Sequence, residues 1–509
     1  MTGKSHALKF IGPAILALSA GAGLYFVFVL YHAGQVMLAL IFLGLLALGT
    51  YIYSASAAYA YRYLFPGIAG AVVFVLFPLI YTVSIGFTNF SSKNLLPYER
   101  ARQYLLDEAD RASDIGYAMS LHAEGRAFRI RLEHPETHKA YVSEPLALRK
   151  SASLDVPIAQ LKDSASALPG DALPLKDIIA HQTALKALTL VLPDKTALRM
   201  TGLREYAAAE RVYEERPDGA LRKKKTGELI KPNFKTGFFE TPDGRSLQPG
   251  FKVNVGLANF IQIFSDQAFR EPFFRIFIWT VVFSTITVLA TTSLGMVLAV
   301  LLNWDALRFR GVYRTLLFLP YAVPGFISIL VFKGLFNNNF GEINLVLDAL
   351  FGIRPAWFSD PALAKLMILL VNTWLGYPYM MVVCMGLIKA IPSDLYEASA
   401  LAGAGPITNF FRITLPLIIK PLTPLMIASF AFNFNNFVLI NLLTAGRPDF
   451  LDTRLPAGTT DLLVSYTYRI AFEDSGQNFG LAAAISTLIF ILVAMLSVVN
   501  MRLTRVNKA

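Results

Sequence analysis

Three asparagines stand in the middle of an apolar run that reads FAFNFNNFVLI, residues 430–440. Lipid offers no partner for an amide, so a polar side chain at this depth either bonds a neighbouring helix or serves a function. Residues i, i+3, i+4 and i+7 of a helix share one face. One such set is Ser429, Phe432, Asn433 and Asn436, whereas Asn435 points away from it.

Two preceding apolar runs carry comparable sets near mid-depth. The sets are Asn372, Leu375, Gly376 and Tyr379 in NTWLGYPYMM, and Tyr321, Pro324, Gly325 and Ser328 in LPYAVPGFIS. Amides and hydroxyls suit the hydroxyl groups of a sugar, and aromatic rings suit its apolar C–H face. We therefore expect one shared cavity for a carbohydrate. Bonding between helices is the alternative for any single asparagine, and we expect it for Asn435 and for the threonines of TITVLATTS, residues 285–293.

Composition indicates which elements must carry these residues. The chain has 509 residues, 55% of them hydrophobic, and a mean hydropathy of +0.50, which is typical of a membrane protein. About 20 apolar residues cross a bilayer as a helix. We predict an α-helical polytopic protein with eight transmembrane helices, over residues 10–31, 36–58, 66–89, 275–302, 312–336, 364–389, 418–443 and 479–501.

Positive charge on alternate short loops predicts the orientation of these helices. Basic residues such as Lys4, Arg62, Arg314 and Lys508 flank the spans on one side. By the positive-inside rule, both termini are expected in the cytoplasm of a bacterial cell and residues 91–272 in the periplasm.

Residues 91–272 form a block of different composition. They hold 27 Lys/Arg and 24 Asp/Glu, against 46 and 35 in the whole chain. Alternating apolar and polar runs around Glu124-Gly125 predict a hairpin, and a short helix is expected over residues 98–113. The predicted domains are three helices over 1–90, a β-rich soluble extracytoplasmic domain over 91–272, and five helices over 273–509.

The sequence disfavours two energy sources, a proton gradient and ATP bound by this chain. Their interiors carry no Asp, Glu, His or Lys in the pattern of a proton relay. TGKS at residues 2–5 lacks the upstream strand and glycine of a phosphate loop. The chain is therefore not expected to be an enzyme, and if ATP is used, another subunit would bind it.

The predicted cytoplasmic loop over 391–417 carries a second motif. It contains Glu397-Ala398-Ser399, Gly403, Ile413 and Leu415-Pro416. A plain connector is one interpretation. In residue types and spacing, however, the loop resembles the EAA coupling motif of binding-protein-dependent ABC importer permeases. Eight spans with a large insert after the third are similar to the permease subunits of maltose/maltodextrin importers, over nearly the whole chain.

The resemblance implies a function and partners. It implies a path for maltose or maltodextrins, a second permease subunit, an ATPase dimer that binds ATP and Mg²⁺, a periplasmic sugar-binding protein, and no cofactor on this chain. It also implies that the motif residues dock on the ATPase and that the mid-membrane sets contact sugar. Two positions depart from the family: Ala402 replaces an acidic residue, and Gly325 a serine. A permease for another oligosaccharide or α-glucoside, an ion-coupled sugar carrier and a membrane-tethered receptor remain alternatives.

Overall fold

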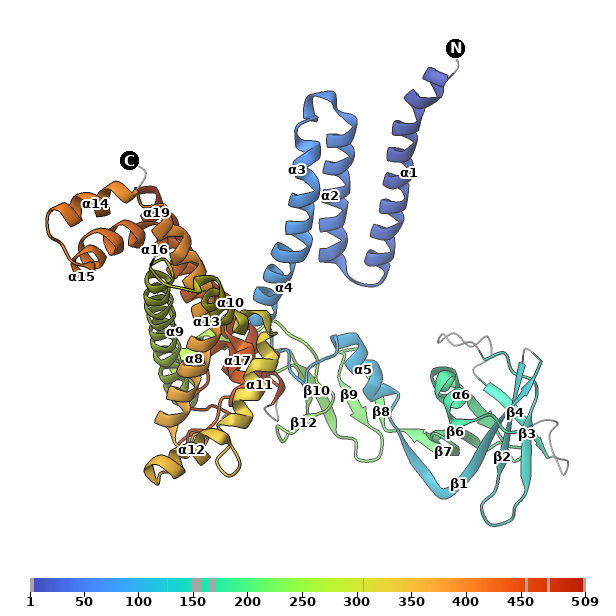
Figure 1. The fold of residues 1–509 in the computed structure, drawn as a ribbon. Helices are drawn as coiled ribbons and strands as arrows, with labels where there is room; N and C mark the ends of the chain where they lie inside the picture. The colour runs from blue at the N-terminus through green and yellow to red at the C-terminus, as the bar shows by residue number, and fades with distance from the viewer. Residues whose placement is uncertain are drawn as a thin grey trace. The chain divides into compact units, whose positions relative to one another are not determined.

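The structure is a computed structural model that describes residues 4–125, 127–148, 158–163, 171–304, 306–453, 456–473 and 477–506. The chain divides into two compact units, Met1–Ser92 with Asn254–Ala509, and Lys93–Val253 (Figure 1). The inserted unit is shorter than residues 91–272, because the chain from Asn254 onward belongs to the helical unit. Lys508, used above for orientation, lies outside the described residues.

Six helical segments within the described residues are long and apolar enough to cross a membrane. Five of the eight predicted spans correspond to single helices, and one to a helix with a π turn at its centre. In chain order the elements are α1 Lys4–His32, α2 Val36–Ser54, the short η1 Ser56–Ala58, α3 Tyr61–Ala71 with η2 Val72–Leu76 and α4 Phe77–Gly86, α9 Gln267–Leu302, α13 Pro361–Lys389, α16 Leu415–Phe434 and α19 Phe479–Val506. The apolar part of α19, Phe479–Met495, is shorter than the other spans. The predicted helical membrane fold with an inserted β-rich domain is confirmed.

Two predicted spans are broken helices rather than continuous ones. Residues 312–336 form α10 Arg310–Ala322 and α11 Gly325–Leu335, bent by 91°. Pro324 lies at the bend, where it favours an extended residue before it, and Val323 is extended at ψ 130°. Residues 418–443 form α16 and α17 Phe437–Leu443, because Asn436 begins a new helix and its side chain accepts a hydrogen bond from the N–H of Leu439.

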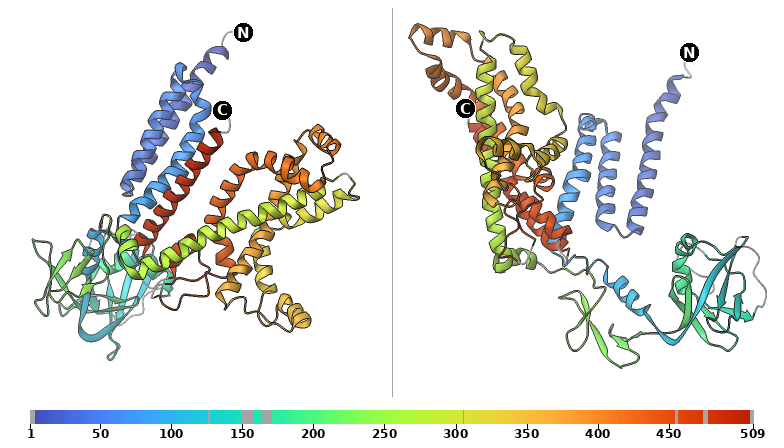
Figure 2. Two further views of the ribbon diagram at one scale, coloured as in Figure 1. Left: turned by 90° about the vertical axis from the view of Figure 1, so that its left-hand side faces the viewer. Right: turned by 60° about the horizontal axis from the view of Figure 1, so that its bottom comes forward.

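The close packing of α9 against α13 forms the centre of the helical unit. A Cβ at Gly295 would lie 2.7 Å from the backbone nitrogen of Met381, and one at Gly376 would lie 2.8 Å from Thr291 Cγ2. Small residues at these points let two helices approach closely. Short helices complete this unit: α8 Ala258–Ser265, α12 Glu342–Phe351, α14 Ser393–Leu401, α15 Pro406–Asn409 with η3 Phe410–Thr414, and α18 Leu463–Phe472. In Figure 1, α14 and α15 lie at the opposite end of α13 from α12, and Figure 2 shows the chain from two further sides.

A buried ion cluster fixes the loop between α17 and α18. The carboxylate of Asp461 is fully buried and accepts hydrogen bonds from Arg469 Nη1 at 2.7 Å, Ser465 Oγ at 2.8 Å and the N–H of Gly458 at 2.8 Å. Arg469 also pairs with Asp449, at 2.6 Å. Burial raises the pKa of Asp461 to about 6, and the charge of Arg469 opposes that rise. Neither ion is left without a counter-charge, as buried charges require.

The inserted unit contains a closed barrel of seven strands. They are β1 Ala109–Glu124, β2 Ala127–Glu133, β3 Ala140–Ser143, β4 Ile158–Asp163, β5 Thr189–Val191, β6 Ala197–Gly202 and β7 Glu205–Arg211, in that order with β7 closing on β1. The β4–β5 pair is parallel and is connected through α6 Leu175–Ala180 and α7 Gln182–Ala187. The hairpin predicted at Glu124-Gly125 is confirmed: Glu124 pairs with Ala127, and Gly125 takes a φ of 62°.

A second, five-stranded sheet completes the inserted unit. Its order is β12 Ser246–Leu247, β11 Phe238–Glu240, β10 Leu229–Asn233, β9 Leu221–Lys223 and β8 Tyr213–Glu215. Helix α5, Tyr98–Leu106, packs Ala101 and Leu105 into the same core as Phe239 and Phe251. The prediction of a helix over 98–113 is wrong in its second half, because residues from Ala109 onward pair as strand β1 with β7.

Candidate functional site

Eleven of the twelve mid-membrane residues expected to share a cavity line one. It has a volume of about 730 Å³, within the range of ligand sites in proteins. The residues come from the α10–α11 bend, from α13, and from α16 to the start of α17; they are Tyr321, Gly325, Asn372, Leu375, Gly376, Tyr379, Ser429, Phe432, Asn433 and Asn436. Pro324 also lines it. The prediction is wrong for Ser328, which is buried and is not among the residues that line the cavity.

Three amides at one side of the cavity bond one another. Asn372 Nδ2 on α13 donates to Asn433 Oδ1 at 2.7 Å and to Thr287 Oγ1 on α9 at 3.3 Å. Asn372 Oδ1 accepts from Asn436 Nδ2 at 3.2 Å. Asn433 Nδ2 donates to the carbonyl of Ser429 at 2.8 Å. The amides thus join α9, α13 and the α16–α17 break, and they line the cavity as well.

The position of Asn436 has a different cause from the one expected. An unbroken helix would place it on the face of Asn433 by spacing alone. Instead α16 ends at Phe434, and Asn436 occupies the N-cap of α17, where an asparagine satisfies a free backbone N–H. The helical-face argument is therefore wrong for Asn436, although the break still directs this residue to the cavity.

Aromatic rings open to the cavity supply its apolar surface. Phe432 is 72% exposed, Tyr321 54% and Tyr379 43%. The Tyr377 hydroxyl, on α13, donates to the carbonyl of Leu317 at 3.0 Å and so ties α10, which carries Tyr321, to α13. The cavity combines polar groups, which suit the hydroxyl groups of a sugar, with exposed aromatic rings, which suit its apolar C–H face.

Two lining residues were assigned a purely structural role by the sequence. Thr287 and Thr291 of α9 line the cavity beside Asn372 and Gly376. Their hydroxyls also bond their surroundings, since Thr291 Oγ1 donates to the carbonyl of Thr287 at 2.8 Å. Thr287 and Thr291 are four residues apart on α9, and Thr291 faces Gly376 of α13; this spacing is the signal that could have identified them.

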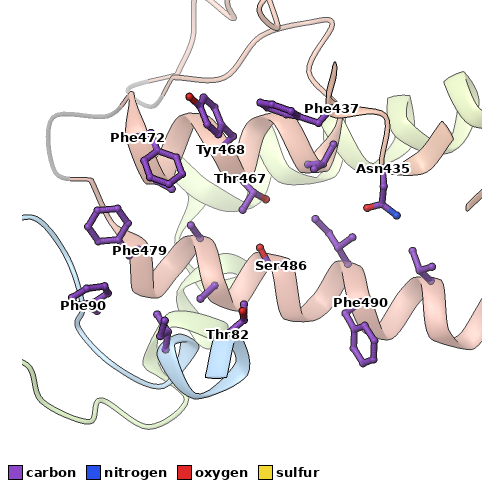
Figure 3. Close-up of a pocket in the computed structure, with 17 residues that line it drawn as sticks. Thr82, Phe90, Asn435, Phe437, Thr467, Tyr468, Phe472, Phe479, Ser486 and Phe490 are labelled. Carbon is purple, nitrogen blue, oxygen red and sulfur yellow. The ribbon is translucent and has the colours of Figure 1, made fainter. Parts of the chain in front are cut away.

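Asn435 lies away from this cavity, as its spacing predicts. It borders a separate, mainly apolar pocket of about 640 Å³ between α17–α18 and α19, which Figure 3 shows with Asn435 directed toward α19. Its Nδ2 donates to the carbonyl of Ala431, at 3.2 Å, within the same helix. We expected Asn435 to bond a neighbouring helix, and this contact does not do so.

The loop over 391–417 forms the short helix that its motif predicts. Helix α14 ends at Leu401, and Gly403 follows with a φ of 77°, in the left-handed region that favours glycine. Among the motif residues, Glu397, Ala398, Gly403 and Pro416 are exposed, whereas Ser399, Ile413 and Leu415 are partly buried. The Ser399 hydroxyl bonds Asn409 Oδ1, and Leu415 packs into the core of the helical unit.

Exposed apolar residues precede and follow the turn at Gly403 along the chain. Leu401 is 92% exposed, Ile407 76% and Phe411 60%. A Cβ placed on Gly403 would meet no atom within 4 Å. The motif therefore divides into a partly buried set that holds the loop in shape and an exposed set that is open to another protein.

Two known protein families match parts of this chain. Residues 96–256 match the family described as the maltose transport system permease protein MalF P2 domain, and residues 291–504 match the binding-protein-dependent transport system inner membrane component.

Similar full-length proteins carry one name. The chain is 52% identical to the maltose/maltodextrin transport system permease protein MalF of Escherichia coli O6:H1, over 99% of this chain and 97% of that protein. It is 54% identical to MalF of Klebsiella aerogenes, over 95% and 94%. A crystal structure of a bacterial alginate ABC transporter matches 49% of this chain and 83% of that chain, at 20% identity and a TM-score of 0.43. By its similarity to the first two proteins along nearly its whole length, the chain belongs to the MalF family of ABC importer permeases, which are inner-membrane components and not enzymes.

Proposed function

We propose that this chain lines the translocation path for maltose or maltodextrins, and that the sugar passes through the cavity of about 730 Å³. The observation that carries the proposal is the joint lining by amides and exposed aromatic rings. The names of its relatives favour this sugar class over another oligosaccharide or α-glucoside. Uptake into proteoliposomes that contain the assembled transporter, measured over a panel of sugars, tests the choice. Uptake of a different class with no uptake of maltose or maltotriose would overturn it.

The proposed transporter is an assembly of several chains. It contains a second permease subunit of the MalG type, an ATPase dimer of the MalK type that binds ATP and Mg²⁺, and a periplasmic sugar-binding protein of the MalE type. Both termini of this chain face the cytoplasm and the inserted unit, Lys93–Val253, faces the periplasm. Copurification with an ATPase in fixed ratio separates this proposal from an ion-coupled carrier and from a receptor. Accessibility of a cysteine at exposed Asp243 to an impermeant reagent tests the orientation.

The exposed part of the loop over 391–417 is the proposed docking surface for the ATPase. Its support is the exposure of the apolar residues Leu401, Ile407 and Phe411, before and after a turn with open space at Gly403. Glu397, exposed on α14, offers a charge to a basic residue of the ATPase. Cysteine crosslinks from Leu401 to the ATPase should form in the complex, and their absence with the complex intact would contradict the assignment.

The barrel-containing unit is the proposed contact for the sugar-binding protein. It has its own core and its own compact fold, and a helical sugar path does not require such an insert. Its excision at Lys93–Val253 should weaken binding of the loaded binding protein while leaving the helical unit assembled with the ATPase. Unchanged affinity after a clean excision would refute this role.

A further inference from the structure

Helix α8, Ala258–Ser265, is held at the level where membrane-crossing helices end. Asn259 on α8 is buried, and its Nδ2 donates to the carbonyls of Gly86 and Thr88, each at 2.8 Å. Gly86 is the last residue of α4. Gly480, at the start of α19, donates its N–H to the carbonyl of Phe90 at 2.8 Å, so α19 begins beside the same segment.

The outer face of α8 is apolar. Leu257, Ile261 and Phe264 are 57%, 58% and 46% exposed, at the spacing of one helical face, whereas Asn259 and Ile263 point inward and are buried. A shallow concavity lies along this face. Large apolar side chains gathered in this way mark a surface that contacts lipid or protein.

This face continues into the exposed apolar row of α9. The Phe264 ring lies 6.4 Å from the ring of Phe274, which is 43% exposed, and Ile278 follows one turn later at 60%. At the same level α9 carries Arg275, whose guanidinium pairs with Glu271 at 2.7 Å and with Asp452 at 2.8 Å. An apolar side next to a charged side is what a helix shows where it passes from hydrocarbon to headgroups.

We propose that α8 is an interfacial helix whose Leu257, Ile261 and Phe264 insert into the outer boundary between lipid headgroups and acyl chains. The lipid bilayer is the occupant because the face is continuous with the apolar row of α9 and is fixed at the ends of α4 and α19. The chain returns from the inserted unit at Asn254, directly before α8, so this helix anchors the returning segment to the membrane surface.

Nitroxide accessibility in the assembled transporter tests the proposal. The natural cysteine, Cys384, is buried and is first replaced by alanine. Single cysteines at Leu257, Ile261 and Phe264 then carry the spin label in nanodiscs. Ile278→Cys serves as the reference for lipid and Asp243→Cys, in the inserted unit, as the reference for water.

The expected result is a higher accessibility to oxygen than to a water-soluble nickel complex at all three α8 positions, between the two references and nearer to Ile278. Accessibility like that at Asp243 would place the face in water and overturn the proposal. Low accessibility to both reagents would mean that a protein partner covers the face, which also overturns it. Complex yield and uptake, measured for each variant, show that the labelled protein is the assembled one. Bimane at the same cysteines, quenched more strongly by headgroup-labelled than by chain-end-labelled lipid, provides an independent check of depth.

Discussion

Replacement of Asn372 by alanine should weaken the helical unit more than the same replacement at Asn435. Asn372→Ala removes three hydrogen bonds, to Thr287, Asn433 and Asn436, which link three separate parts of the fold. At about 0.6 kcal/mol for each such bond in a membrane protein, the loss is about 2 kcal/mol. The groups left behind line a cavity of about 730 Å³ that water can enter, so the larger penalty for dry unsatisfied groups does not apply.

The two variants differ in what they break and are otherwise matched. Asn435→Ala loses a bond within its own helix, so we expect a change of about 0.6 kcal/mol or less. Thermal stability of the purified complex, followed by size-exclusion chromatography, reports the first effect. Uptake per assembled complex reports a role in sugar contact, and we expect it to fall for Asn433→Ala and Asn436→Ala. If Asn372→Ala proves as stable as Asn435→Ala, the amide junction does not join the helices.

Four further predictions concern individual side chains. Gly403→Leu should abolish coupling with the ATPase, whereas Gly403→Asn, which tolerates a positive φ, should retain more of it; equal activity of both variants with the ATPase bound would contradict the docking assignment. Gly325→Ser should fold normally, because a Cβ at this position meets no atom within 4 Å. Gly376→Ser should lower the yield of the complex, because a Cβ there lies 2.8 Å from Thr291. Equal yields of the two variants would show that α9 and α13 can separate freely. Arg469→Leu leaves Asp461 buried without its cation and should cost about 3–5 kcal/mol, more than Asp461→Asn in the same thermal assay. Burial raises the pKa of Asp461 from 3.8 to about 6, so the stability gained from its protonation is complete below pH 3.8 and is lost as pH rises through 6; Asp461→Asn should lack this pH dependence.

Helical spacing alone identified most of the cavity. Asn372, Gly376 and Tyr379 lie on an unbroken helix, α13, so the rule of i, i+4 and i+7 places them on one face. The same rule could not foresee that Asn436 caps a new helix, because that outcome depends on where α16 ends. It also could not assign Thr287, since a threonine on α9 becomes a cavity residue only through its neighbour on α13.

The inserted domain shows where local patterns are insufficient. Alternation identified the β1–β2 hairpin, which has a short loop and a glycine with positive φ. It did not identify the start of β1, because residues 109–111 pair with β7, about a hundred residues later in the chain. The local sequence of those residues favours a helix, but pairing with the distant strand β7 makes them a strand instead.

The question raised by the asparagines has an answer in their remaining hydrogen-bonding capacity. An asparagine amide has two N–H donors, and Asn372 uses both of them on Asn433 and Thr287. It therefore cannot donate to a sugar without breaking the junction. Asn433 and Asn436 each donate one N–H, to Ser429 and to Asn372, and each retains a second N–H. The exposed rings of Phe432 and Tyr321 add apolar surface to the same cavity. On the proposed path, Asn433 and Asn436 are therefore the amides available to a sugar, whereas Asn372 holds the helices together, and this is the difference that uptake per complex and thermal stability of the variants measure.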